Sequence, residues 1–218
     1  MIKNKLVITL LVALMILGLN PRKVEAKANT NATNLMIVAH PDDESIFGGY
    51  HLSKKKYLVV CITAGKNKKR VKEFKKAMKY YKDDYMMLGF PDKTNGKRNN
   101  WHKCKSKITF KLSKIINEKN WKCIVTHNPD GEYGHIHHKM TSKIVTNLIT
   151  NKNKLFYFNK YFKRNDLLQN KRKPILNYQK TKKKVKQLYK CYPSQSKVID
   201  HLYHIIDLEK FIPYKQWK

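Results

Sequence analysis

The chain has 218 residues, which is enough for one domain with a full hydrophobic core. Lysine and arginine total 47 against 15 acidic residues, giving a formal net charge of +32. The positive charge is mostly lysine spread along the chain, without any familiar nucleic-acid-binding motif, so we expect no specific nucleic-acid partner. The charge favours a solvated basic surface, with an anionic cell-surface polymer as a candidate partner. No obligatory protein partner is predicted.

Residues 1–26 have the order of a secretory signal peptide. Lys3 and Lys5 precede an apolar run over 6–19, and Val24-Glu25-Ala26 resembles a small-residue cleavage site. A membrane-spanning helix needs about 20 apolar residues, and this run is shorter. We therefore expect a cleaved signal and a secreted or extracytoplasmic protein, with an uncleaved N-terminal membrane anchor as the alternative.

The rest of the chain predicts a flexible leader at 27–33 followed by one domain at 34–218. Short apolar runs predict buried strands at 35–39, 57–62, 123–125 and 155–158. Apolar residues at helical spacing separate these runs, at 71–78 and 108–116, and a further helix spans 141–148. Strands that alternate with helices predict an α/β fold, a Rossmann-like three-layer domain with a mostly parallel sheet.

The C-terminal part is less regular. Residues 163–184 are very polar and rich in lysine, which predicts a long surface insertion. A last helix is expected at 185–192. The four cysteines, Cys61, Cys104, Cys123 and Cys191, are widely spaced, so buried thiols are expected, although export would permit a disulfide.

Two segments rich in histidine and acidic residues directly follow predicted strands. The first is His40-Pro41-Asp42-Asp43-Glu44, after strand 35–39, and the second runs from His127 to His138, after strand 123–125. Ligands of open parallel sheets bind beyond the carboxyl ends of the strands. We therefore expect both segments at the same edge of the sheet, where they form one site.

The residue types in these segments point to metal chemistry. His40 and Asp43, three residues apart across a turn, suit zinc, and a catalytic zinc site keeps one position for water. Asp42 would lie beside the metal, where a carboxylate can take the proton from a bound water. His135 and His138 share one face of a helix start, so one can complete the metal site while the other faces the substrate.

The remaining histidines have weaker support. We expect His51, His102, His201 and His204 to be surface or packing residues. His127 and His137 are close to the predicted site, and the sequence leaves a structural role open for both.

Several of these segments together resemble a known family. Ala39-His40-Pro41-Asp42-Asp43-Glu44 resembles the signature of the LmbE-like family, which includes the GlcNAc-phosphatidylinositol de-N-acetylases (PIG-L). Gly134-His135-Ile136-His137-His138 resembles its second histidine motif. Weaker similarities lie at Gly48-Gly49, Thr63-Ala64-Gly65, Arg70 to Glu73 and Gly89 to Asp92, so the resemblance covers about residues 35–145. Tyr192-Pro193-Ser194-Gln195 is faintly similar as well.

The resemblance implies a role for individual residues and makes 34–218 a deacetylase domain. His40, Asp43 and His138 match the family's zinc ligands, and Asp42 matches its general base. His135 matches the histidine that stabilises the oxyanion and helps to protonate the leaving amine, and Tyr133 matches a tyrosine that assists at the oxyanion. Arg70 and Asp92 match positions that contact substrate.

The sequence therefore predicts a zinc-dependent hydrolase that removes the N-acetyl group from an N-acetylglucosamine-containing substrate. His and Asp ligands do not by themselves choose zinc over iron(II), so Fe²⁺ is the alternative metal. Two other functions remain open: a zinc amidase or esterase acting on another acyl group, and a non-enzymatic basic protein that binds polyanions.

Overall fold

A computed structural model describes residues 30–169 and 173–217. The predicted signal peptide, residues 1–26, lies outside the described residues, as do residues 27–29 of the predicted leader. Residues 30–33 lie against the domain, because Ala32 is buried and the Thr30 hydroxyl donates to the Asp84 carboxylate at 2.5 Å. No helix in the described part of the chain is long and apolar enough to cross a membrane.

Six strands form one sheet in the order β3-β2-β1-β6-β7-β8. The first five are parallel, and β8 is antiparallel to β7. Their bounds are β1 Asn34–Val38, β2 Tyr57–Thr63, β3 Asp84–Phe90, β6 Cys123–Thr126, β7 Leu155–Phe158 and β8 Phe211–Pro213; a separate hairpin consists of β4 Lys93–Thr94 and β5 Lys97–Arg98. The four predicted strands and the mostly parallel sheet are confirmed, whereas β8 and the hairpin have no predicted counterpart.

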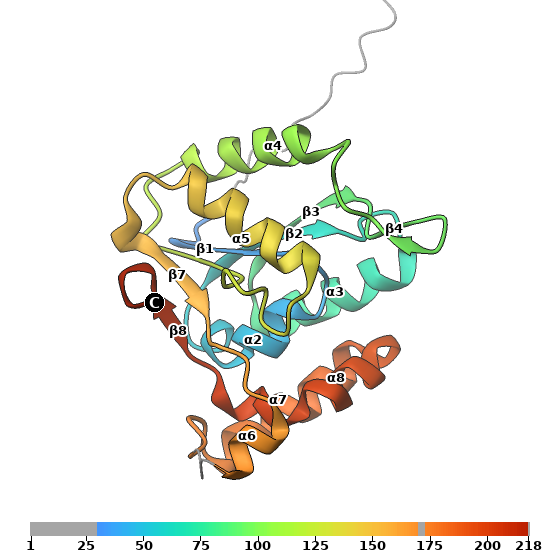
Figure 1. Cartoon of the computed structure of the whole chain (residues 1–218), viewed down its shortest axis with the longest axis vertical. Coiled ribbons are helices and arrows are strands. Elements are labelled where there is room, and N and C mark those ends of the chain that lie inside the picture. The colour runs from blue at the N-terminus through green and yellow to red at the C-terminus, as the bar shows by residue number, and fades with distance from the viewer. Residues whose placement is uncertain (1–29, 170–172, 218) are drawn as a thin grey trace, which may run out of the picture.

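Helices cover both faces of the sheet (Figure 1). On one face lie α4 Lys105–Asn117 and α5 Ile136–Leu148; on the other lie α2 Asp43–Leu52 and α3 Lys68–Tyr81, followed outward by α6 Arg164–Gln169, α7 Tyr178–Cys191 and α8 Ser196–Leu202. Short 3₁₀ turns are η1 Lys152–Lys154, η2 Pro193–Gln195, η3 Tyr203–Leu208 and η4 Tyr214–Gln216. The predicted three-layer α/β fold is therefore present.

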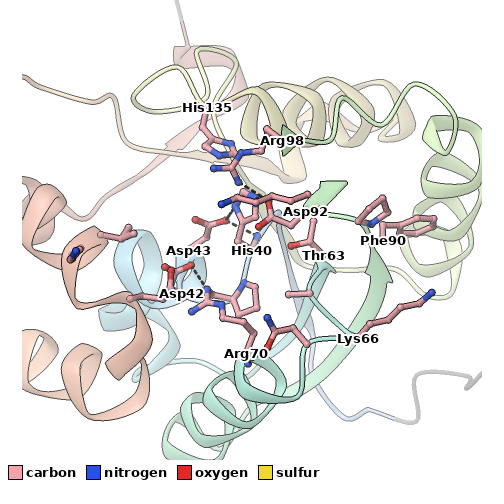
Figure 2. Close-up of a pocket in the computed structure, with 18 of the residues that line it drawn as sticks. His40, Asp42, Asp43, Thr63, Lys66, Arg70, Phe90, Asp92, Arg98 and His135 are labelled. Carbon is pink, nitrogen blue, oxygen red and sulfur yellow. Dashed lines mark hydrogen bonds and ion pairs between the residues drawn. The ribbon is translucent and has the colours of Figure 1, made fainter. Parts of the chain in front are cut away.

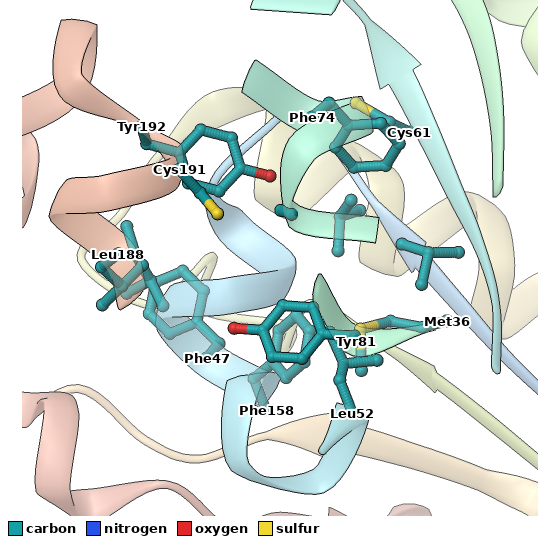
Figure 3. Close-up of a cluster of buried hydrophobic side chains, with 14 of the residues drawn as sticks. Met36, Phe47, Leu52, Cys61, Phe74, Tyr81, Phe158, Leu188, Cys191 and Tyr192 are labelled. Atoms are coloured by element: carbon teal, nitrogen blue, oxygen red, sulfur yellow. The ribbon is translucent and has the colours of Figure 1, made fainter. Parts of the chain in front are cut away.

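Alternate residues of the central strands pack into two separate hydrophobic clusters, one on each face of the sheet. Met36 and Val38 of β1 pack with α2, α3 and α7 (Figure 3), whereas Leu35 and Ile37 pack with α4 and α5. Successive side chains of a strand point to opposite faces, so a strand covered on both sides must be apolar throughout. This explains why the central strands are continuous apolar runs in the sequence.

The polar stretch 163–184 differs from the prediction of a surface insertion. Helix α6 lies inside it, and α7 begins at Tyr178, seven residues before the predicted start at 185. Leu188 and Cys191 of α7 are buried, and so is Lys184, whose Nζ contacts the Glu209 carboxylate at 2.6 Å. The lysine-rich outer face of this amphipathic helix dominates its composition and conceals the buried face.

The strand order places a topological switch point between β1 and β6. Along the chain, the sheet first grows from β1 through β2 to β3, and then continues on the other side of β1 with β6. Open α/β sheets bind their ligands in the crevice at this point, beyond the carboxyl ends of the strands. His40 follows β1 and His127 follows β6, so both histidine-rich segments enter this crevice.

Asp83, between α3 and β3, gives a prediction about stability. Its Oδ1 accepts a hydrogen bond from the Tyr57 amide at 2.8 Å, while its buried Oδ2 has no partner among the described residues. Burial raises the pKa of Asp83 from 3.8 to about 7. The folded protein therefore holds this proton more tightly than the unfolded chain does, and the stability that Asp83 contributes is lost as the pH rises from about 4 through 7.

We expect Asp83→Asn to remove this dependence. Between pH 5 and pH 8 the free energy of unfolding of the wild type should fall by roughly 2 kcal/mol relative to the variant, measured by urea denaturation. Asp84→Asn is the control, since Asp84 is more exposed and pairs with Lys56. Equal pH dependence in the wild type and Asp83→Asn would contradict the prediction.

Candidate active site

Three side chains from separate elements bring their donor atoms together at the switch point. His40 Nδ1 lies 3.2 Å from an Asp43 carboxylate oxygen and 3.3 Å from His138 Nε2, and His138 Nε2 lies 3.3 Å from the other Asp43 oxygen. Tetrahedral zinc with bonds of about 2.0–2.1 Å separates its ligand atoms by about 3.3 Å. The donor atoms of the three residues predicted as metal ligands are therefore close enough together to hold one metal ion.

Glu132, which the sequence prediction missed, orients the histidines from behind. Its Oε2 contacts His138 Nδ1 at 2.6 Å and His127 Nδ1 at 2.9 Å. A hydrogen bond at Nδ1 of His138 keeps the Nε2 lone pair free for a metal, an arrangement common among zinc histidines. The other nitrogen of His127 lies 3.3 Å from Asp43, so His127 has a place in the site as well.

The charges of this group suit a cation. Burial raises the pKa of Asp43, but His138, His40 and His127 outweigh it and hold that pKa well below the usual range. In the same way His127 and His138 overcome the effect of burial on Glu132 and lower its pKa to about 2. Two ionised, buried carboxylates thus lie among imidazoles, and a divalent metal would replace the positive charge of the protons that ligating imidazoles give up.

His137 orients the other side of His40. His40 Nε2 lies 3.0 Å from His137 Nδ1, and His137 Nε2 lies 2.5 Å from the Asn99 carbonyl oxygen. The His137 ring stacks on Trp101 at 4.2 Å, and burial together with nearby His40 lowers its pKa to about 4. A neutral His137 that donates to Asn99 accepts from His40, which leaves Nδ1 of His40 for the metal.

We call His40, Asp43 and His138 the ligand triangle. Asp42 lies beside His40 and Asp43 of this triangle and forms an ion pair with Arg70 (Figure 2). Burial raises the pKa of Asp42 to about 7, although the Arg70 guanidinium, 3.2 Å from its Oδ1, acts against the rise. A general base works best when its pKa is near the operating pH. Arg70 also bonds to the Pro41 carbonyl and to Glu73, so this predicted substrate contact is already engaged with the predicted base.

His135, Tyr133 and Asp92 line the same cavity. His135 is the N-cap of α5, and its Nδ1 accepts from the His137 amide at 3.2 Å, which places the ring proton on Nε2. Burial, followed by the nearby His138 and His40, lowers the His135 pKa to about 2. Tyr133 packs edge-on to His135, and Asp92 lies 2.6 Å from Arg98 and 3.5 Å from His40 Nε2.

The cavity in front of these residues has a volume of about 1030 Å³. Its cationic side chains are Lys66, Arg70, Lys93, Arg98 and Lys197. Part of the wall comes from α8 and the turn before it, including His201, which the sequence analysis had taken as a surface or packing residue. The cavity therefore extends well beyond the ligand triangle, over loops that follow β1, β2 and β3.

The sequence carried only a weak signal for the supporting residues. Glu132 could have been found as the acidic residue between His127 and His138 in the second segment, because zinc histidines are often paired with a carboxylate. His137 and Arg98 have no comparable spacing signal, since their contacts depend on where the loop before α4 lies.

Asp43 is the carboxylate of the ligand triangle, which predicts that its loss empties the site. We expect Asp43→Ala to be purified with much less than one zinc per chain, measured by elemental analysis after dialysis against trace zinc. Asp130→Ala is the matched control, because Asp130 is exposed in the loop between β6 and α5. An Asp43→Ala protein that retained one zinc at this site would exclude Asp43 as a ligand.

Glu132→Gln should weaken the site without removing a ligand. The amide can no longer accept from both imidazoles, so we expect zinc affinity to fall by about 10–100-fold, the range typical of such supporting carboxylates. Competition with a chromophoric chelator measures this change. Wild-type affinity in the variant would mean that Glu132 serves the fold alone.

Three comparisons relate the chain to known proteins. The sequence pattern of the GlcNAc-PI de-N-acetylase (PIG-L) family matches residues 35–149. Uncharacterized protein L374 of Acanthamoeba polyphaga mimivirus is 32% identical over 208 residues, covering 87% of this chain and 84% of that protein. The N,N'-diacetylchitobiose deacetylase of Pyrococcus horikoshii has a similar fold, with a TM-score of 0.56, 14% identity and coverage of 83% of this chain and 78% of that one. The matched segment contains the whole ligand triangle and Asp42, and the chain belongs to the GlcNAc-PI de-N-acetylase (PIG-L) family.

Proposed function

We propose that the chain is a zinc-dependent hydrolase that removes the N-acetyl group from an N-acetylglucosamine-containing substrate. Family membership supports a deacetylase, and the observation that carries the finer proposal is the position of Asp42. This buried carboxylate, with its pKa raised to about 7, lies next to a three-ligand metal site that opens into a large cavity. A base beside an open metal position is the arrangement that amide hydrolysis by water requires.

Each of these residues has a separate role in the proposed reaction. A zinc ion held by His40, Asp43 and His138 would supply an acidified water and polarise the acetamide carbonyl. Asp42 accepts the proton of the attacking water. His135 is neutral and carries its proton on Nε2, so it donates a hydrogen bond to the oxyanion that develops on the carbonyl oxygen, and Tyr133 lines the same side of the cavity.

The leaving amine needs a proton, and Asp42 is the better donor. The family resemblance implies that His135 helps to protonate the amine, but a pKa lowered to about 2 favours hydrogen-bond donation over proton transfer. Asp42 has just taken a proton from water and has a pKa near neutrality, so it can return that proton to the nitrogen. Acetate and a free amine then leave.

The cavity supports a substrate larger than one acetamide group. Its volume of about 1030 Å³ is at the upper end for small-ligand sites, so a sugar ring with its attached group fits. The cationic walls support an anionic conjugate or an anionic surface polymer as the substrate or partner. The solved structure with a similar fold is named for a chitobiose substrate, which also supports an N-acetylated amino sugar.

Export remains part of the proposal. The predicted signal at 1–26 would place the enzyme outside the cytoplasm, with an uncleaved anchor as the alternative; N-terminal sequencing of the protein recovered from the medium and from membranes distinguishes the two. Zinc is proposed over Fe²⁺ as the working metal, and elemental analysis of protein purified without added metal tests that choice.

Asp42→Asn is the central test. We expect acetate release from GlcNAc-containing substrates to fall by about 10²–10⁴-fold, the usual contribution of a general base, while zinc content stays at the wild-type value. Release should also stop with a chelator and return with zinc. Asp130→Asn, in an exposed position of the neighbouring loop, is the control that should retain activity.

Two results would contradict the proposal. A fully active Asp42→Asn enzyme would exclude Asp42 as the base. No acetate release from zinc-loaded wild type would mean that the site acts on a different acyl group, or that the chain binds polyanions without turnover.

A further inference from the structure

The backbone of Asp42 is in an unfavourable conformation. Its φ is 113° and its ψ is −33°, a region that residues with a side chain rarely adopt. Such conformations persist only where surrounding groups hold them, and they concentrate at functional sites. The groups that stabilise this backbone conformation therefore help to set the orientation of the Asp42 carboxylate.

Two side chains fix this residue from opposite sides. Glu44 is fully buried, and its Oε2 accepts a hydrogen bond from the Asp42 amide at 3.1 Å. Arg70 donates to the Pro41 carbonyl, just before Asp42, and to the Asp42 carboxylate at 3.2 Å. Backbone and carboxylate are thus held separately.

Both side chains are in turn held by the short segment that follows α7. The Tyr192 hydroxyl donates to Glu44 Oε1 at 2.5 Å, and its ring lies 5.8 Å from the Arg70 guanidinium. Ser194 donates its amide and hydroxyl to Glu73 at 2.8 and 2.7 Å, and Glu73 accepts from Arg70 at 3.1 Å. Tyr192 projects from the end of α7 towards α2 (Figure 3).

We propose that Tyr192 and Ser194 are positioning residues for the deacetylation reaction, acting through Glu44 and Glu73 to keep Asp42 aimed at the reacting water. Neither residue touches the cavity side of the ligand triangle, and both lie beyond the segment 35–149 that carries the family pattern. The inference rests on the proposed function in so far as Asp42 is the base. Its geometric part, the control of the Asp42 backbone, can be tested separately.

Tyr192→Phe tests the hydroxyl while the buried ring keeps its packing. We expect kcat for acetate release to fall by about 10–100-fold, the cost of a misplaced catalytic group, with KM within about twofold and zinc content unchanged. Tyr189→Phe is the matched control, because Tyr189 lies on the same helix and donates to exposed Asp200. It should keep the wild-type kcat. Ser194→Ala should lower kcat in the same way and provides a second variant at a half-buried position.

A double-mutant cycle tests the route through Glu44. If the Tyr192 hydroxyl acts through Glu44, the losses in kcat of Tyr192→Phe and Glu44→Gln are clearly less than additive when combined. Additive losses would overturn this route. A loss in melting temperature without a change in kcat would overturn the positioning role and leave only a structural one.

A crystal structure of Tyr192→Phe separates this inference from the proposed function. A backbone φ of Asp42 that leaves the region near 113° supports the positioning role, even if wild type releases no acetate from any substrate tried. An unchanged Asp42 overturns the inference, even if the wild-type enzyme is an active deacetylase.

Discussion

The pairing of β1 with β6 is the constraint on which the site depends. Ile37 lies opposite Thr126 in the parallel register, so the two strands end almost level. The Thr126 hydroxyl also donates to the Ile37 carbonyl at 2.9 Å, which fixes the strand ends to each other. His40 and the loop from His127 therefore leave the sheet side by side, and α5 returns over the same crevice with His138. A slip of one residue in this register would shift His40 along the strand direction relative to the loop from His127. It would also turn the side chains of β6 to the opposite face of the sheet.

Although the chain is very basic, many of its acidic residues are buried, and several of them lie at the candidate site. Among the described residues, seven acidic side chains are buried, so the surface lysines have few carboxylates near them. The seven are Asp42, Asp43, Glu44, Glu73, Asp83, Glu132 and Glu209. A buried charge without a partner is costly, and most of these carboxylates accept from an imidazole, a guanidinium or an ammonium group. Removing one of those partners, such as Arg70 or Lys184, would leave a carboxylate uncompensated in the interior, which is more damaging than losing the partner's own contacts.

The fold was predictable where one strong pattern decides the structure. The four central strands are apolar runs because both faces are covered, and no other element within residues 30–169 and 173–217 gives that pattern. β3 was not among the predicted strands, because it is a half-buried edge strand with mixed composition. β8 has three residues and ends at a proline, which suits an edge but gives no periodicity to detect. The first part of helix α7, before residue 185, was missed because the lysines of this helix outnumber the few residues that it buries.

The proximity of the predicted site residues could be predicted to the same extent. The proposed ligands and the proposed base lie within short local motifs, and the strand ends fix where those motifs go. The supporting groups are different in kind: Glu44 and Tyr192 are 148 residues apart, and their contact follows from how α7 packs on α2. No spacing in a single sequence encodes such a contact. Sequence therefore reveals the reacting groups more readily than the groups that aim them.

The proposed reacting groups and part of the cavity wall come from different parts of the chain. The segment 35–149 holds His40, Asp43, His138, Asp42 and His135, which are the groups that carry the proposed reaction. The rest of the chain contributes α7, which packs on α2, and α8, whose Lys197 and His201 form part of the cavity wall. The outer cavity, which would contact the substrate beyond its acetamide, is thus partly built from the C-terminal part. Under the proposed function, changes there would alter the aim of Asp42 and the shape of the cavity together, so substrate preference and rate would be coupled.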